Sequence, residues 1–135
     1  NDDVNGSTDT YVYYAFAEVE GFSNFSSYVG NGVVDGPCIY TGFQPAFLLI
    51  RGVNSPISDW GLMDTARSPY NPSDIIFLVN ENSAEYTASD LDFLANGFKL
   101  RSSTGISNRS AQVYVYAAFA EYPFGGDGAT PATAF

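Results

Sequence analysis

Short β-prone runs, separated by turn residues at intervals of about ten residues, constrain the fold of this chain most strongly. Between these runs the sequence places Gly, Pro, Asn and Ser, and apolar residues nowhere keep a helical period. The pattern predicts an all-β fold: an antiparallel β-sandwich or barrel of jelly-roll, lectin-like type. The expected strands are residues 11–18, 25–29, 38–41, 46–51, 60–64, 75–79, 91–94, 98–101 and 113–121.

Local signals refine this expectation at two places. Asn96-Gly97 separates two apolar runs and predicts a hairpin with a type I′ turn, because both residues tolerate positive φ. Residues 83–89 are the only stretch that could form a helical turn, and a loop fits them equally well. We expect the core to contain Phe47, Leu49, Phe93, Phe98, Leu100, Val115 and Phe119.

Composition limits the classes of function. The 135 residues suffice for one domain with a core of its own, and no apolar run is long enough to span a bilayer. The net charge of −10 disfavours binding to nucleic acid, whose phosphates it would repel. The chain has no histidine, which excludes Ser/His and Cys/His catalysis, and its one cysteine, Cys38, is expected to be buried. It opens with Asn1 rather than Met, as a processed chain or an excerpt does.

An internal repeat links the two ends of the sequence. Residues 11–18 (YVYYAFAE) match residues 114–121 (YVYAAFAE) at seven of eight positions. The two segments could be neighbouring strands of one sheet, or the first could close an upstream unit or pair with another subunit. For the last case the expected contact residues are Tyr11, Tyr13 and Phe16. We therefore divide the chain into an N-terminal strand (1–20), a β-sandwich domain (21–124) and a short tail (125–135).

Acidic and aromatic residues supply the other candidate sites. Asp90 with Asp92, and Asp59 with Asp64 beside Trp60, could be read as glycosidase carboxylate pairs, but nothing in the sequence predicts that either pair is desolvated. No EF-hand spacing is present. We therefore predict no enzymatic activity, no catalytic residues, no metal site and no cofactor. Aromatic and amide side chains in loop-like segments fit the binding of a glycan or receptor better, and the candidates are Trp60, Tyr70 and Asn71.

Several motifs, taken in order, resemble one known family. They are AEVEGFS at 17–23, YVGNG at 28–32, YTGFQP at 40–45, DTARSPYN at 64–71, DFLANGFKLR at 92–101 and YVYAAFAEYPF at 114–124. Together they are similar to the C-terminal β-rich domain of bacteriophage tail fibres and tail proteins.

That resemblance implies a structural protein of the virion, found in the virion or outside the cell, and it implies no catalytic residues. The expected function is self-assembly, as a trimer or another homo-oligomer, and adhesion to a host-surface glycan or protein, with other virion proteins as partners. Two alternatives stay open at this point: a decoration or filament subunit without receptor binding, and a secreted carbohydrate-binding module. Sequence predicts neither a nucleic acid partner nor a membrane span.

Overall fold

The computed structural model describes residues 6–53 and 59–123, and within them every regular element is a β-strand. The expected strands are present from the second onward, with ends shifted by a few residues. The eight strands are β1 (Ser23–Val29), β2 (Cys38–Tyr40), β3 (Pro45–Gly52), β4 (Gly61–Asp64), β5 (Ser73–Leu78), β6 (Tyr86–Leu94), β7 (Gly97–Leu100) and β8 (Val113–Ala120). No helix long and apolar enough to cross a membrane occurs in these residues.

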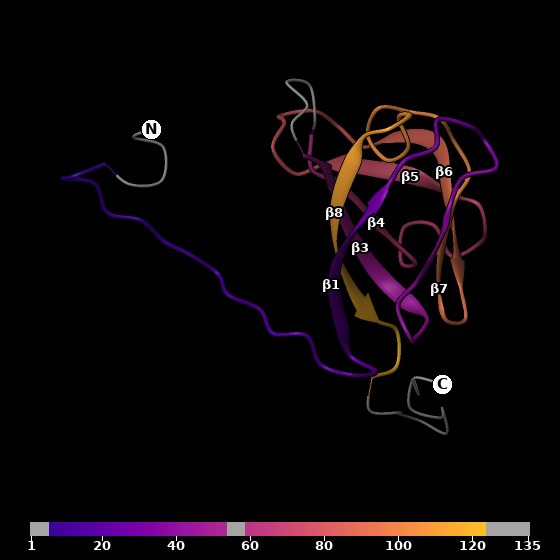
Figure 1. The fold of residues 1–135 in the computed structure, drawn as a ribbon, viewed down its shortest axis with the longest axis horizontal. Helices are drawn as coiled ribbons and strands as arrows, with labels where there is room; N and C mark the ends of the chain where they lie inside the picture. The colour runs from indigo at the N-terminus through magenta and orange to yellow at the C-terminus, as the bar shows by residue number, and fades with distance from the viewer. Residues whose placement is uncertain (1–5, 54–58, 124–135) are drawn as a thin grey trace.

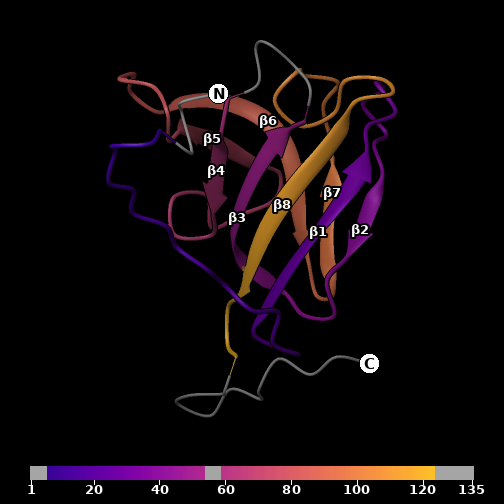
Figure 2. The same ribbon diagram turned by 60° about the vertical axis from the view of Figure 1, so that its left-hand side comes forward.

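All eight strands join one antiparallel sheet in the order β1-β8-β3-β4-β5-β6-β7-β2. The sheet curls until its two ends approach each other, so the molecule is nearly a barrel (Figures 1 and 2). β1 and β2 are the two end strands, and each has one hydrogen-bonded neighbour in the sheet. The broad prediction of an all-β, antiparallel fold is confirmed.

The core lies inside the curled sheet, where both halves direct side chains toward each other. Tyr28 on β1 and Tyr116 on β8 meet Phe98 on β7, with ring centroids 6.1 and 5.2 Å apart. Burial of such rings is the main favourable term in a sheet of this size. The fully buried apolar side chains that complete this layer are Leu48, Ile50, Met63, Ile76, Leu91, Leu100, Tyr114 and Ala118.

The predicted core is right on β6 and β7 but wrong on β3 and β8. Phe93, Phe98 and Leu100 are buried as predicted. On β3 and β8, however, Phe47, Leu49, Val115 and Phe119 point outward, and the alternate residues face the core. Side chains alternate between the faces of a strand, so an error of one residue reverses the whole strand.

The hairpin between β6 and β7 is confirmed, but its predicted turn is wrong. Leu94 pairs with Gly97, so Ala95 and Asn96 form the turn, and neither Asn96 nor Gly97 has a positive φ. The reason for glycine at position 97 is proximity: a Cβ there would lie 2.0 Å from the carbonyl oxygen of Ile39 on β2. The sequence allowed a helical turn or a loop for residues 83–89, whereas β6 begins at Tyr86 within this stretch.

Two further expectations are corrected. Cys38 is exposed at the start of β2, an end strand that leaves its side chain in solvent. Residues 11–18 form no strand, although residues 114–121, which match them at seven of eight positions, supply most of β8. β8 lies between β1 and β3, so both of its edges are already bonded and the repeat does not pair beside it. The predicted C-terminal tail (125–135) lies outside the described residues.

Candidate assembly surface

Residues 6–18, which we call the arm, extend away from the barrel. The arm leaves at the base of β1 and runs clear of the sheet in both views (Figures 1 and 2). Its side chains are among the most exposed apolar groups of the molecule: Val12, Tyr13, Tyr14 and Phe16 are 81, 85, 83 and 67% exposed. Contiguous apolar exposure of this kind is unusual on a monomeric protein and is typical of interaction sites.

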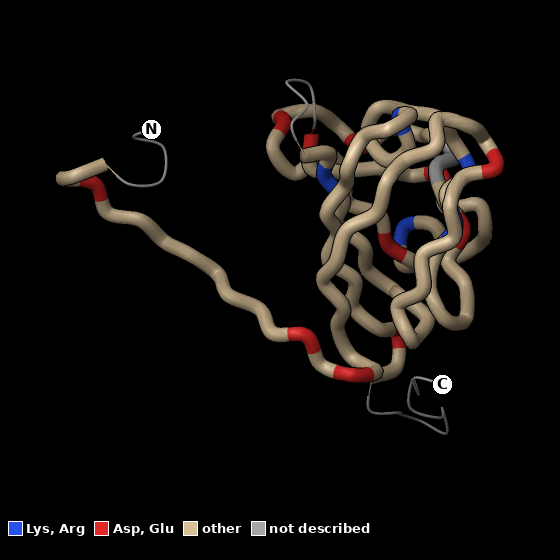
Figure 3. Tube along the Cα trace, in the orientation of Figure 1, with Lys and Arg blue, Asp and Glu red and all other residues tan. Residues whose placement is uncertain are grey.

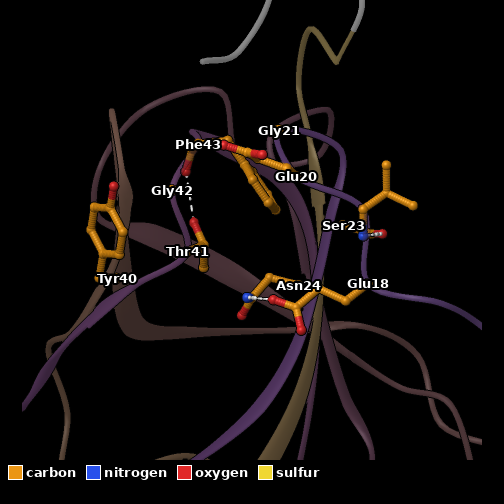
Figure 4. Close-up of a pocket in the computed structure, with 10 residues that line it drawn as sticks. Glu18, Glu20, Gly21, Ser23, Asn24, Tyr40, Thr41, Gly42 and Phe43 are labelled. Atoms are coloured by element: carbon orange, nitrogen blue, oxygen red, sulfur yellow. Dashed lines mark hydrogen bonds between the residues drawn. The ribbon is translucent and has the colours of Figure 1, made fainter. Parts of the chain in front are cut away.

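The base of the arm is fixed to the start of β1. The Ser23 hydroxyl donates a hydrogen bond to the Ala17 carbonyl at 3.0 Å, and Val19 forms an isolated bridge with Ser23. The Asn24 side-chain amide donates to the Glu18 carboxylate at 2.6 Å (Figure 4). These contacts hold residues 17–19 in place, so the exposed part of the arm starts from a defined point.

An aromatic cluster covers the outer face of the sheet beside this point. Phe119 on β8 contacts the rings of Phe16, Phe22, Phe25 and Phe47, with centroids 5.7 to 6.0 Å apart in edge-on geometry. Phe16 also stacks on Phe25 at 5.9 Å. The arm thus supplies one ring to an apolar patch that continues along β8 through the exposed Val113 and Val115.

In β8, alternate side chains of the repeated sequence are buried in the core. Tyr114 is fully buried, stacks on Tyr28 at 5.2 Å and donates its hydroxyl hydrogen to the Gly105 carbonyl at 2.9 Å. Tyr116 donates to the Asn24 side-chain oxygen at 2.5 Å, and Ala118 is fully buried. Their counterparts in the arm are Tyr11, Tyr13 and Ala15, which face solvent. The arm therefore carries the core-facing pattern of a strand without a core to face.

A pocket of about 370 Å³ lies between the base of the arm and the end of β2 (Figure 4). Glu18, Glu20 and Asn24 line one side, and Tyr40 and Thr41 the other. The Thr41 hydroxyl donates to the Phe43 carbonyl at 2.7 Å, and Glu18 accepts the bond from Asn24. The bond between Asn24 and Glu18 holds the base of the arm to β1 on this side of the pocket.

At the opposite end of the barrel, Asn108 joins the loop between β1 and β2 to its own loop between β7 and β8, a role that the sequence did not reveal. Its buried amide nitrogen donates to Asn31, to the Val33 carbonyl and to the Ser102 carbonyl, at 2.8 to 3.0 Å. Its oxygen accepts from the Asn31 backbone at 2.9 Å. Both its amide nitrogen and its oxygen thus bond to groups of the fold itself, so the side chain has a structural role.

The predicted glycan-binding residues are only partly brought together. Tyr70 and Asn71 line a pocket of about 310 Å³ in the loop between β4 and β5, and Tyr70 is 84% exposed. Asn71 exchanges two hydrogen bonds with the Phe93 backbone, at 2.7 and 2.8 Å. Trp60 precedes β4, whereas Tyr70 follows it. The Trp60 ring lies 5.3 Å from the Arg51 guanidinium. The loop presents Tyr70 without Trp60.

Three of the four carboxylates considered as catalytic pairs bond to a neighbouring side chain. Asp92 is buried and paired with Arg101, and Asp64 accepts hydrogen bonds from Arg67. Asp59 accepts from Asn80 at 3.0 Å, and the side chain of Asp90 lies outside the described residues. In the part of the chain that the structure describes, no three acidic or Cys side chains are grouped to hold a metal ion.

One carboxylate has a perturbed titration. The hydrogen bond from Lys99, and then its positive charge, lower the pKa of Asp35. The Lys99 ammonium lies 2.8 Å from this carboxylate. Asp35 is fully exposed, so the pair adds little to stability.

Comparison with known proteins adds a family. The model of a domain of unknown function, DUF7483, matches residues 1–123. The chain belongs to the DUF7483 family. No curated protein and no solved structure matches it. The matched range covers both the arm and the barrel, so the arm is part of the DUF7483 domain.

Proposed function

We propose that this DUF7483 domain is a non-catalytic structural domain of a bacteriophage virion, of tail-fibre type. It assembles with copies of itself, for example as a trimer, and with other virion proteins, and it presents loops to a glycan or protein on the host surface. The virion or the extracellular space is then its location, and neither nucleic acid nor a cofactor is needed. The resemblance of its ordered motifs to tail-fibre domains supports this proposal.

The exposed arm is the observation that carries the assembly part. Four of its apolar side chains are at least 67% exposed. Contact between apolar surface and water is unfavourable in free energy. Association covers the surface, and a particle with many copies then gains avidity from weak individual contacts. A filament or decoration subunit would use the same arm, so the two functions differ in whether the loops bind a host ligand.

We also propose that the barrel is a variant of the jelly roll, a long hairpin rolled up so that early strands pair with late ones. The pairs β1–β8, β2–β7 and β4–β5 support this. β3 pairs with β4 instead of β6, which makes β3 to β7 a meander and would distinguish this variant.

Adhesion is tested with Tyr70. Immobilised host cells or glycans should retain the protein, and Tyr70→Ser should reduce retention by about tenfold. Tyr122→Ser is the matched control, because Tyr122 is also exposed, at 51%, and lies outside the Tyr70 pocket. Equal retention of both variants would refute adhesion through this loop, and an assembling protein without any retention would favour the filament or decoration subunit.

A further inference from the structure

β1 has an edge that can accept another strand. At the ends of its pairing with β8, Ala120 donates to the Phe22 carbonyl and Gly30 to the Gln112 carbonyl, both at 2.9 Å. Bonded and non-bonded pairs alternate along an antiparallel ladder, so the even-numbered residues of β1 bond to β8. Phe25, Ser27 and Val29 therefore direct their backbone N–H and C=O groups to the other edge, where no strand of the described residues pairs with them.

The arm has the sequence of a strand that already pairs with β1. β8 pairs with β1 along its whole length, from Ser23↔Phe119 to Val29↔Val113. The arm repeats seven of eight residues of that partner. The other end strand, β2, has only three residues, too few to hold a strand of this length. The sequence match and the edge length both favour β1.

Charge also permits this contact. A net charge of −10 makes copies of the chain repel each other. The arm carries no charge between Asp9 and Glu18, as the uncharged stretch in Figure 3 shows, and β1 carries none. Pairing the two brings no like charges opposite one another.

The chain's own arm does not occupy its β1 edge, since it runs away from the barrel (Figures 1 and 2). An edge strand with open backbone groups is a template for a segment of another chain. The occupant that the sequence identifies is therefore the arm of a second copy.

We propose that residues 11–16 of one copy add to the free edge of β1 in a second copy, as an antiparallel strand. This inference rests on the proposed self-assembly and specifies its contact. The even-numbered residues of the arm lie opposite Phe25, Ser27 and Val29 in bonded pairs. Directly opposite residues share a face, so Tyr11, Tyr13 and Ala15 then face the core side, as their counterparts do in β8.

This geometry gives two neighbouring residues of the arm different roles. The backbone N–H of Tyr14 donates to β1, whereas that of Tyr13 points to solvent on the far edge. Proline removes the N–H and is tolerated in an edge strand only where that group faces solvent. Tyr14→Pro should therefore weaken association, and Tyr13→Pro should preserve it.

The acceptor has its own pair of variants. Ser27 is exposed and its N–H faces the free edge, so Ser27→Pro blocks the edge while the β1–β8 bonds remain. Ser27→Ala keeps the N–H and is the control.

The experiment is sedimentation of the full chain and these four variants, from about 1 to about 100 µM. We expect wild type, Tyr13→Pro and Ser27→Ala to associate, and Tyr14→Pro and Ser27→Pro to associate at least about tenfold more weakly. Hydrogen exchange on wild type should show that the amides of Phe25, Ser27 and Val29 become protected as concentration rises.

The outcomes separate the two claims. A wild-type monomer at every concentration would refute the proposed self-assembly itself. Association of wild type with equal effects of Tyr13→Pro and Tyr14→Pro, and without protection of the three β1 amides, would refute only the β1 edge. Should Ser27→Pro unfold, as circular dichroism would show, the arm variants and the exchange data decide, because the arm lies off the barrel.

Discussion

Aromatic side chains on the inner and outer faces of the sheet contribute unequally to stability. Phe98 is fully buried against Tyr28 and Tyr116, whereas Phe119 lies on the outer face among rings that remain in contact with solvent. Phe98→Ala should lower the free energy of unfolding by about 3–5 kcal/mol, and Phe119→Ala by about 2 kcal/mol. Chemical denaturation measures both, and a larger loss for Phe119 would contradict the assignment of faces.

Tyr116 should make the free energy of unfolding depend on pH in the alkaline range. Burial raises the pKa of its hydroxyl above the ordinary value of 10.0. A raised pKa means that the folded state favours the neutral phenol, so its contribution is complete below about pH 10 and is lost as pH rises through the folded pKa. Stability measured from neutral to alkaline pH should fall less steeply for Tyr116→Phe. An unchanged slope would show that another group titrates.

At the scale of elements, the β6–β7 hairpin depends on Gly97 because of its neighbour β2. An added Cβ would meet the Ile39 carbonyl oxygen at 2.0 Å, and that atom belongs to backbone, which cannot rotate aside. Gly97→Ala should destabilise the domain by about 1–3 kcal/mol.

Gly61→Ala is the control for this substitution. Its added Cβ would approach the Ile106 side-chain methyl at 2.8 Å, an atom that can shift, so the loss should be smaller. Thermal unfolding of the two variants compares them, and equal losses would mean that β2 moves freely with the hairpin.

For the whole molecule, charge and assembly oppose each other. Each copy carries a net charge of −10, while the proposed contact between arm and β1 is uncharged. Salt screens repulsion, since the Debye length falls from about 10 Å at 0.1 M to about 3 Å at 1 M. Association should therefore strengthen as salt is raised, as measured by sedimentation at fixed protein concentration. Weaker association at high salt would indicate a contact made by ion pairs.

The local sequence predicted the all-β class, seven of the eight strands closely and the position of the hairpin at Asn96. Strand propensity and turn chemistry act over a few residues, so they can be recognised along the chain. The site was predicted less well: the exposed Tyr70 loop and the arm were singled out, but Trp60 lies apart from Tyr70, and the outer aromatic cluster and Asn108 were not foreseen.

The tertiary structure alone decided which face of β3 and β8 is buried, because that depends on the strands lying opposite them. It likewise gave Gly97 its role through contact with Ile39. The clearest case is the repeated octapeptide. By itself this sequence specifies a strand with Tyr and Ala on its core-facing side. In β8 it is paired on both edges, by β1 and β3. In the arm it stays extended in solvent, because β8 already occupies the position between β1 and β3 in the chain's own sheet.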